Sequence, residues 1–89
     1  AIDLGIIAVA ASSYKNAPIA KDTVIMGEVG LTGEVRRINL IEKRIKEAEK
    51  LGFKTCIIPE SNKKLLKEQY KLDIIGVKNI RDMMKYLGL

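Results

Sequence analysis

Few residues in this sequence could carry out chemistry. It contains no histidine, and its single cysteine, Cys56, lies within an apolar run. A histidine base, a zinc site with imidazole ligands and a disulfide are therefore excluded, and we expect neither a metal nor a cofactor. A thiol inside an apolar strand behaves as a small buried hydrophobe, so we expect Cys56 to be unreactive.

Hydroxyl and carboxyl groups are the remaining candidates for catalysis. Ser12 and Ser13 lie at the end of a predicted helix, where serine hydroxyls commonly bond backbone carbonyls. Ser61 stands where it would cap another helix. Glu28 and Glu34 lie on two predicted strands, and we interpret them as solvent-facing rather than as a catalytic pair. No catalytic constellation results from these residues.

Three glycines mark the stretch from 27 to 37, which reads GEVGLTGEVRR. Glycines of this kind can cradle a phosphate, but no Gly-Lys-Ser/Thr follows and the pattern around them predicts a hairpin. We therefore interpret these glycines as positions of positive φ or of close contact between strands.

The net charge of +5 points to an anionic partner. Residues 1–40 carry equal numbers of basic and acidic side chains, so the excess of lysine and arginine lies beyond residue 40. DNA, contacted through its phosphates, is the first candidate, and a lysine-rich solvated surface or a subunit contact is the alternative. With only four aromatic residues, a stacking platform is poorly supported. The candidate contacts are Arg36, Arg37, Lys43, Arg44 and Lys46. Neighbours in a strand face opposite sides, so only one of the two arginines should share a surface with the next helix.

These residues must be positioned by one small domain, residues 1–89, of the α/β or α+β class. Asn39 with Glu42, and Asn79 with Asp82, have the spacing of helix N-caps. The final strand, helix and strand should form a right-handed parallel crossover. No apolar run is long enough to cross a membrane, and we expect a reducing, cytoplasmic location. The expected elements are a helix over 2–15, a hairpin of strands 23–29 and 34–38, a helix over 39–52, a strand over 55–58, a helix over 61–70, a strand over 72–77 and a helix over 79–87, in the order α-β-β-α-β-α-β-α.

The stretch 27–37, together with 50–54 (KLGFK) and 57–59 (IIP), resembles the proteolytic domain of Lon proteases. The segments 2–4, 10–14, 22–28 and 74–77 are closer still to the C-terminal Lon-protease-like domain of the RadA (Sms) family of bacterial DNA-repair proteins. The resemblance implies the fold of a ribosomal-protein domain, a mixed sheet flanked by helices. It covers only the later half of that domain.

This resemblance also implies what the chain should do. The Lon nucleophile position falls on Ala1 and the Lon base position on Glu42, with Lys43 one residue beyond, so the peptidase dyad is absent. We expect a non-catalytic scaffold and interaction domain of an ATP-dependent DNA repair and recombination protein. Its expected partners are DNA, the remainder of the ATPase and a second copy, since the missing strands would leave apolar surface uncovered. The alternatives are a Lon-type Ser-Lys peptidase in another register and an independent small basic nucleic-acid-binding protein.

Overall fold

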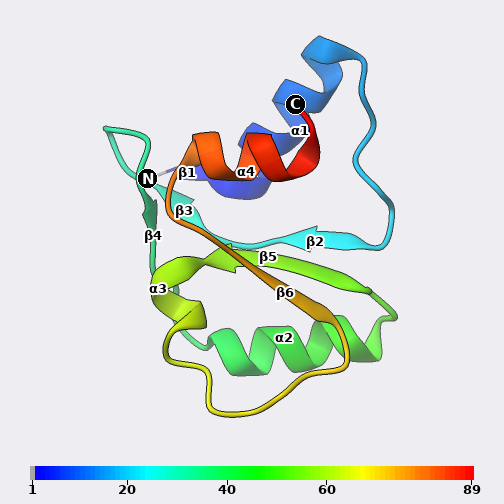
Figure 1. Cartoon of the computed structure of the whole chain (residues 1–89), viewed down its shortest axis with the longest axis vertical. Helices are drawn as coiled ribbons and strands as arrows, with labels where there is room; N and C mark the ends of the chain where they lie inside the picture. Colours follow the sequence, from blue (N-terminus) through cyan, green and yellow to red (C-terminus); the bar gives the residue numbers. More distant parts are fainter. Residues whose placement is uncertain (1) are drawn as a thin grey trace.

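The computed structural model describes residues 2–89 and has an α+β fold, as predicted. Figure 1 shows α1 and α4 on one side of β5 and β6 and α2 on the other. The elements are β1 (Ile2–Asp3), α1 (Leu4–Lys15), β2 (Thr23–Ile25), β3 (Glu28–Val29), β4 (Val35–Arg36), α2 (Ile41–Lys50), β5 (Thr55–Pro59), α3 (Glu60–Lys63), β6 (Asp73–Val77) and α4 (Ile80–Leu87).

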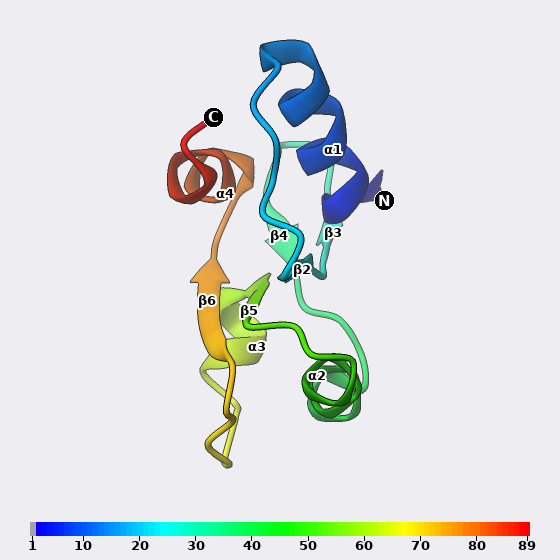
Figure 2. The ribbon, with the colours of Figure 1, turned by 90° about the vertical axis from the view of Figure 1, so that its right-hand side faces the viewer.

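The strands form two small sheets rather than the single mixed sheet that we expected. One is antiparallel, in the order β1-β3-β4, and the other is parallel, in the order β2-β5-β6. The predicted strand 23–29 is divided because Gly27, at φ 153°, turns the chain out of one sheet and into the other. A Cβ atom at Gly27 would lie 3.2 Å from Val35 of β4 and 3.4 Å from Pro59 of β5, so the two sheets approach each other closely here. Figure 2 shows β2 of the parallel sheet close to β3 and β4 of the antiparallel sheet.

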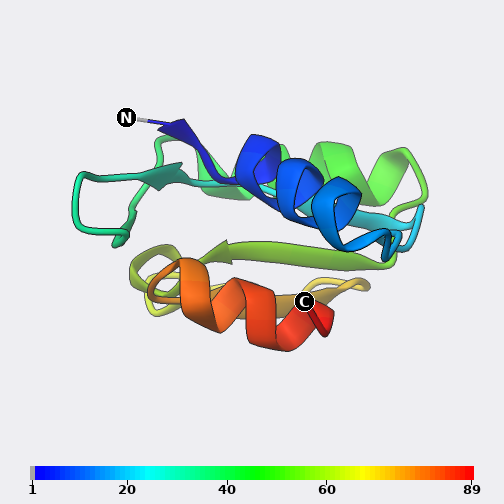
Figure 3. The ribbon, with the colours of Figure 1, turned by 90° about the horizontal axis from the view of Figure 1, so that it is seen from above.

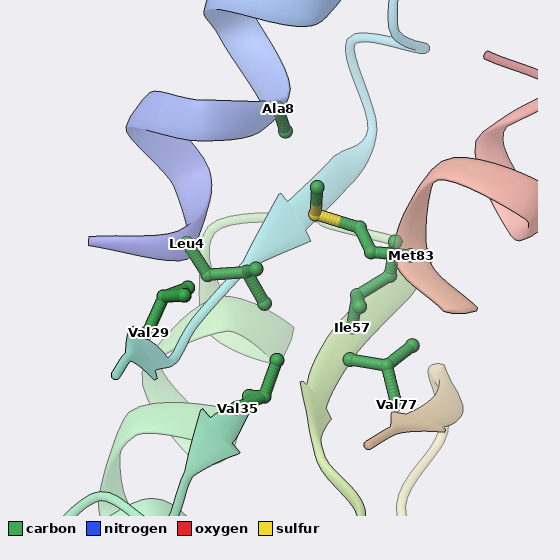
Figure 4. Packing of buried hydrophobic residues seen from close by; sticks show 7 residues of the cluster. All are labelled: Leu4, Ala8, Val29, Val35, Ile57, Val77 and Met83. Carbon is green, nitrogen blue, oxygen red and sulfur yellow. The ribbon is translucent and has the colours of Figure 1, made fainter. Parts of the chain in front are cut away.

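Strand β5 is covered on both faces, as its apolar run predicted. Ile57 packs into a core formed by α1, α4 and both sheets, with Leu4 and Met83 at its centre (Figure 4). Cys56 and Ile58 point the other way, into a second core against α2. Because successive side chains of a strand alternate in direction, one strand serves both cores.

Helices α1 and α4 lie next to each other when the molecule is seen from above (Figure 3). The Lys15 ammonium donates a hydrogen bond to the Leu89 carbonyl at 3.0 Å, which joins the end of α1 to the C-terminal residue. The expected helix over 2–15 begins only at Leu4, because Asp3 is its N-cap and accepts a hydrogen bond from the Ile6 N–H. The first two described residues instead pair with β3.

The predicted helix over 61–70 is wrong beyond its first turn, since α3 ends at Lys63. Ser61 lies inside α3, whose N-cap is Pro59, so the predicted serine cap is also wrong. The chain after α3 packs Leu66 and Tyr70 against the core beneath α2. This packing outweighs the helix propensity of the segment.

Only one of the two predicted asparagine caps forms. Asn79 accepts a hydrogen bond from the Asp82 N–H at 2.8 Å and caps α4. At α2 the N-cap is Leu40, at φ 58°, with no side-chain hydrogen bond, so Asn39 does not cap and Glu42 is not its partner. The Glu42 carboxylate instead accepts a hydrogen bond from the Tyr70 hydroxyl at 3.4 Å.

Candidate functional site

A hollow of about 560 Å³ lies between the antiparallel sheet and the first turns of α2. Its basic side chains are Arg37, Lys43 and Arg44, all exposed and all among the predicted phosphate contacts. Residues 25–28, from the end of β2 to the start of β3, and residues 38–40 also line it. The structure therefore brings together three of the five predicted cations.

The two adjacent arginines separate as strand alternation predicted. Arg36 lies on the same face of the hairpin as Glu34, and their side chains form an exposed ion pair at 3.3 Å. Arg37 turns to the other face and lines the hollow with Lys43. The Arg36 side chain is thus paired with Glu34 within the hairpin. Arg37 is the arginine that shares a surface with α2.

Lys46, the fifth predicted contact, does not line the hollow. Its ammonium pairs with the Glu68 carboxylate at 3.4 Å, on the side of α2 that faces the segment after α3. Exposed pairs of this kind contribute at most about 1 kcal/mol. Lys46 is therefore separated from the Arg37 surface by its direction on the helix.

Glu34 organises the hairpin tip beside this surface. The Thr32 hydroxyl and N–H both donate to the Glu34 carboxylate, at 2.6 and 3.1 Å. These bonds to Thr32, with help from Arg36, lower the pKa of Glu34 to about 2. Hydrogen bonds to the ionised form favour it, so the carboxylate stays charged and keeps Arg36 engaged.

Asn62 holds the basic segment in place. Its side chain is only 3% exposed, accepts a hydrogen bond from the Ile38 N–H at 2.9 Å and donates one to the Ile38 carbonyl at 3.0 Å. This pair of bonds fixes the backbone between Arg37 and α2. It also delays the start of the helix to residue 41, which explains why Asn39 is not the cap.

The charges in the hollow are balanced. Asp3, Glu28 and Glu47 line it beside the three cations. Within the part of the chain that the structure describes, none of these carboxylates forms an ion pair with Arg37, Lys43 or Arg44. The cations therefore stay available to an anion, but three nearby carboxylates weaken the field that attracts it.

Within residues 2–89, the hollow that contains Lys43 does not place a nucleophile beside this lysine. Ala1, the predicted nucleophile position, lies outside the described residues. Glu42 contacts Tyr70, and the hollow around Lys43 has no serine, threonine or cysteine in its lining. Ser12 donates its hydroxyl hydrogen bond to the Ala17 carbonyl, the structural role predicted for it.

Cys56 is fully buried, and burial raises the pKa of its thiol to about 11. A neutral thiol is a poor nucleophile, so this cysteine is structural, as predicted. Among residues 2–89 there is no group of three or more His, Cys, Asp or Glu side chains that could hold a metal ion. In the same range, no helix combines the length and apolar character that a membrane span needs.

Two cations that the sequence analysis missed lie in a second hollow. Lys64 and Lys78 share it with Arg37, beyond the carboxyl ends of β5 and β6. In parallel sheets this edge commonly binds ligands. The position of Lys78, directly after a predicted strand, was a signal that the sequence contained. Asn62 gave no such signal, because its role depends on contacts distant in sequence.

An apolar groove of about 830 Å³ runs along α1 and β2. Ile6 and Val9, each 65% exposed, form one wall, and Val24 with Phe53 lies on the other side. Strand β2 is also the edge of the parallel sheet. Uncovered apolar surface, which we expected on the first helix or the hairpin, is thus present along α1.

Together, the fold and the two hollows define a small α+β domain that presents exposed cations on both sides of Arg37. The sequence profile of the family described as "Subunit ChlI of Mg-chelatase" matches residues 1–62, and the chain belongs to this family.

Similarity to RadA extends over nearly the whole chain, and the predicted resemblance to that protein is confirmed. The sequence is 46% identical over 85 residues to the DNA repair protein RadA of Bacillus subtilis (strain 168), a match that covers 96% of this chain and 19% of the relative. It is 42% identical to RadA of Streptococcus pneumoniae, where 96% of this chain and 20% of the relative are covered. The corresponding RadA of Listeria monocytogenes is 41% identical, with coverages of 96% and 19%. The chain thus spans about a fifth of the length of these relatives.

Proposed function

We propose that this chain is a non-catalytic, Lon-like scaffold and interaction domain of a RadA-type ATP-dependent DNA repair and recombination protein, and that it contacts DNA through Arg37, Lys43 and Arg44. The observation that carries the DNA contact is the convergence of these exposed side chains on one hollow without ion pairs among the described residues. The relatives are named DNA repair proteins, which supports the same partner.

The contact would be to phosphates rather than to bases. Lysine and arginine at the mouth of an open hollow can neutralise phosphate oxygens, which positions a duplex without reading its sequence. Because Asp3, Glu28 and Glu47 line the same hollow, we expect weak binding that is highly sensitive to salt.

A titration of labelled duplexes tests this proposal. Two unrelated sequences of one length should bind equally well at low salt, and affinity should fall steeply as salt rises. Replacing Lys43 by glutamine should weaken binding. The matched control is Lys46→Gln, because Lys46 already pairs with Glu68 outside the hollow. An equal loss in the control would show that net charge alone, and not this hollow, determines binding.

The absence of peptidase activity is a second part of the proposal. Glu42 stands at the Lon base position and contacts Tyr70, and no hydroxyl or thiol side chain lines the hollow around Lys43. Incubation with casein should leave the substrate intact, and a serine-reactive phosphonate should not label the chain. Specific cleavage or labelling would instead favour the Lon-type Ser-Lys peptidase.

We also propose that the apolar groove along α1 and β2 is a self-association surface, filled by a second copy. Its exposed Ile6 and Val9 are the kind of patch that monomers rarely leave uncovered. Light scattering over a concentration series should show association that Val9→Glu abolishes. Leu31→Ser is the control, since Leu31 is fully exposed at the hairpin tip and outside the groove. A strict monomer at high concentration would overturn this part.

A further inference from the structure

The second hollow, of about 340 Å³, carries a larger excess of positive charge than the first. Arg37, Lys64 and Lys78 line it, and Glu60 is its only acidic lining residue. The first hollow has as many carboxylates as cations, whereas here the cations exceed the carboxylate by two. Two of these cations, Lys64 and Lys78, belong to the basic excess beyond residue 40.

The three segments that carry these cations are tied to one another. The Val35 N–H donates to the Lys78 carbonyl at 2.9 Å, which joins β4 to the end of β6. The Asn62 side chain joins α3, just before Lys64, to the Ile38 backbone, just after Arg37. In Figure 1, α3 lies directly below β4 at the same side of the molecule. The cations are thus placed by backbone tethers before any ligand binds, which reduces the ordering cost of binding.

Glu60, which also lines this hollow, packs against Gly76. Its carboxylate lies against Gly76, where a Cβ atom would be 2.7 Å from the nearer oxygen, so the absence of a side chain at Gly76 makes room for it. Among residues 2–89, Glu60 forms no ion pair, and neither do Lys64 and Lys78. Both lysines are exposed.

We propose that this second hollow binds a phosphate monoester group, either free or at the end of a nucleic acid strand. A monoester carries a charge of about −1.5 to −2 at pH 7, which matches the excess of two cations better than a single internal phosphodiester does. The planar guanidinium of Arg37 suits two phosphate oxygens, and the Ser61 hydroxyl in the lining is a further donor.

Arg37 lines both hollows, so the two sites are adjacent. A strand end whose terminal phosphate occupies the second hollow could continue past Arg37 toward Lys43. The second site does not require duplex binding in the first, because neither Lys64 nor Lys78 lines the first hollow.

The test is an NMR titration of the full chain with inorganic phosphate at constant ionic strength, followed through the backbone amides of 60–65 and 76–79. Lys64→Gln and Lys78→Gln should each raise the phosphate dissociation constant about three- to fivefold, as expected for loss of one exposed charge contact. Lys67→Gln is the control, since Lys67 is exposed but lines neither hollow. Far-UV circular dichroism would confirm that each variant folds.

A second arm distinguishes the sources of the phosphate. An oligonucleotide with a 5′-phosphate should bind more tightly than the same strand with a 5′-hydroxyl, and Lys78→Gln should remove the difference. Tighter binding of free phosphate than of either strand would assign the site to a small molecule. Phosphate shifts that are unchanged in both lysine variants, or equal binding of a glutamate-rich peptide, would overturn the proposal. Phosphate binding without any duplex binding would refute only the first hollow's role.

Discussion

The side chain of Asn62 should contribute more to stability than any other polar group near the basic surface. It makes two hydrogen bonds with the Ile38 backbone, at 2.9 and 3.0 Å, from a site that is 3% exposed. Asn62→Leu removes both bonds and leaves the Ile38 N–H and carbonyl without their partner. An orphaned buried polar group costs about 1–3 kcal/mol. Because Ile38 is half-buried and water can reach part of it, we expect a total loss of about 2–3 kcal/mol.

That loss is a large share of the stability of so small a domain. At roughly 0.05–0.15 kcal/mol per residue, the free energy of unfolding of a chain of this size is about 4–13 kcal/mol. The free energy of unfolding of a small domain falls by about 1 kcal/mol per molar urea, so Asn62→Leu should lower the urea concentration at the unfolding midpoint by roughly 2–3 M. The sequence has no tryptophan, so unfolding is best followed by far-UV circular dichroism.

Amide hydrogen exchange provides an independent measurement. The Ile38 amide should be protected in the native chain and unprotected in Asn62→Leu. Asn39→Ala is the control, because Asn39 is exposed. Ordinary surface substitutions change the free energy of unfolding by less than about 0.5 kcal/mol. A loss that small in Asn62→Leu would refute the stabilising role of the two Asn62–Ile38 hydrogen bonds.

Four further predictions concern single positions. Asn79→Ala should cost about 0.5–2 kcal/mol in urea unfolding through loss of the α4 cap, whereas Asn39→Ala should be nearly neutral; equal losses would contradict the observed caps. Gly27→Ala should destabilise the chain by about 2–5 kcal/mol, because a positive φ and close contacts with neighbouring side chains both oppose a Cβ atom. A fully stable variant would contradict the close packing around Gly27 where the two sheets meet. Glu34 should titrate near pH 2 by NMR. Because its pKa in the folded chain lies below the ordinary glutamate value of about 4.5, its stabilising effect should be complete above about pH 4.5 and be lost as pH falls toward 2; titration near 4.5 would argue against the Thr32 bonds. Cys56 should resist Ellman's reagent at neutral pH and react only as fast as the chain opens; rapid labelling of the native protein would contradict its burial.

Local patterns were sufficient to predict much of the fold. The apolar run of β5, the glycine that ends α2 and the cap of α4 follow from the properties of neighbouring residues, and all three are present. The opposite directions of Arg36 and Arg37 likewise followed from strand geometry.

The predictions that failed depend on contacts distant in sequence. Asn39 and Asn79 have the same spacing to an acidic residue, yet only Asn79 caps, because Asn62 fixes the backbone before α2. The helix expected over 61–70 ends early because its later residues pack under α2. Lys64 and Arg37 line one hollow only because Asn62 of α3 is hydrogen-bonded to Ile38, in the segment after β4. No spacing in the sequence contains this information.

The salt dependence of duplex binding by Arg36→Ala and Arg37→Ala tests the central claim most directly. Fluorescence anisotropy of one labelled duplex at several salt concentrations gives the slope of log affinity against log salt. Because Arg37 faces the hollow and Arg36 pairs with Glu34, Arg37→Ala should reduce the slope by about 0.9 per lost phosphate contact, and Arg36→Ala should leave it unchanged. Equal reductions in both variants, or no duplex binding by the parent chain at low salt, would contradict the assignment of this surface to DNA.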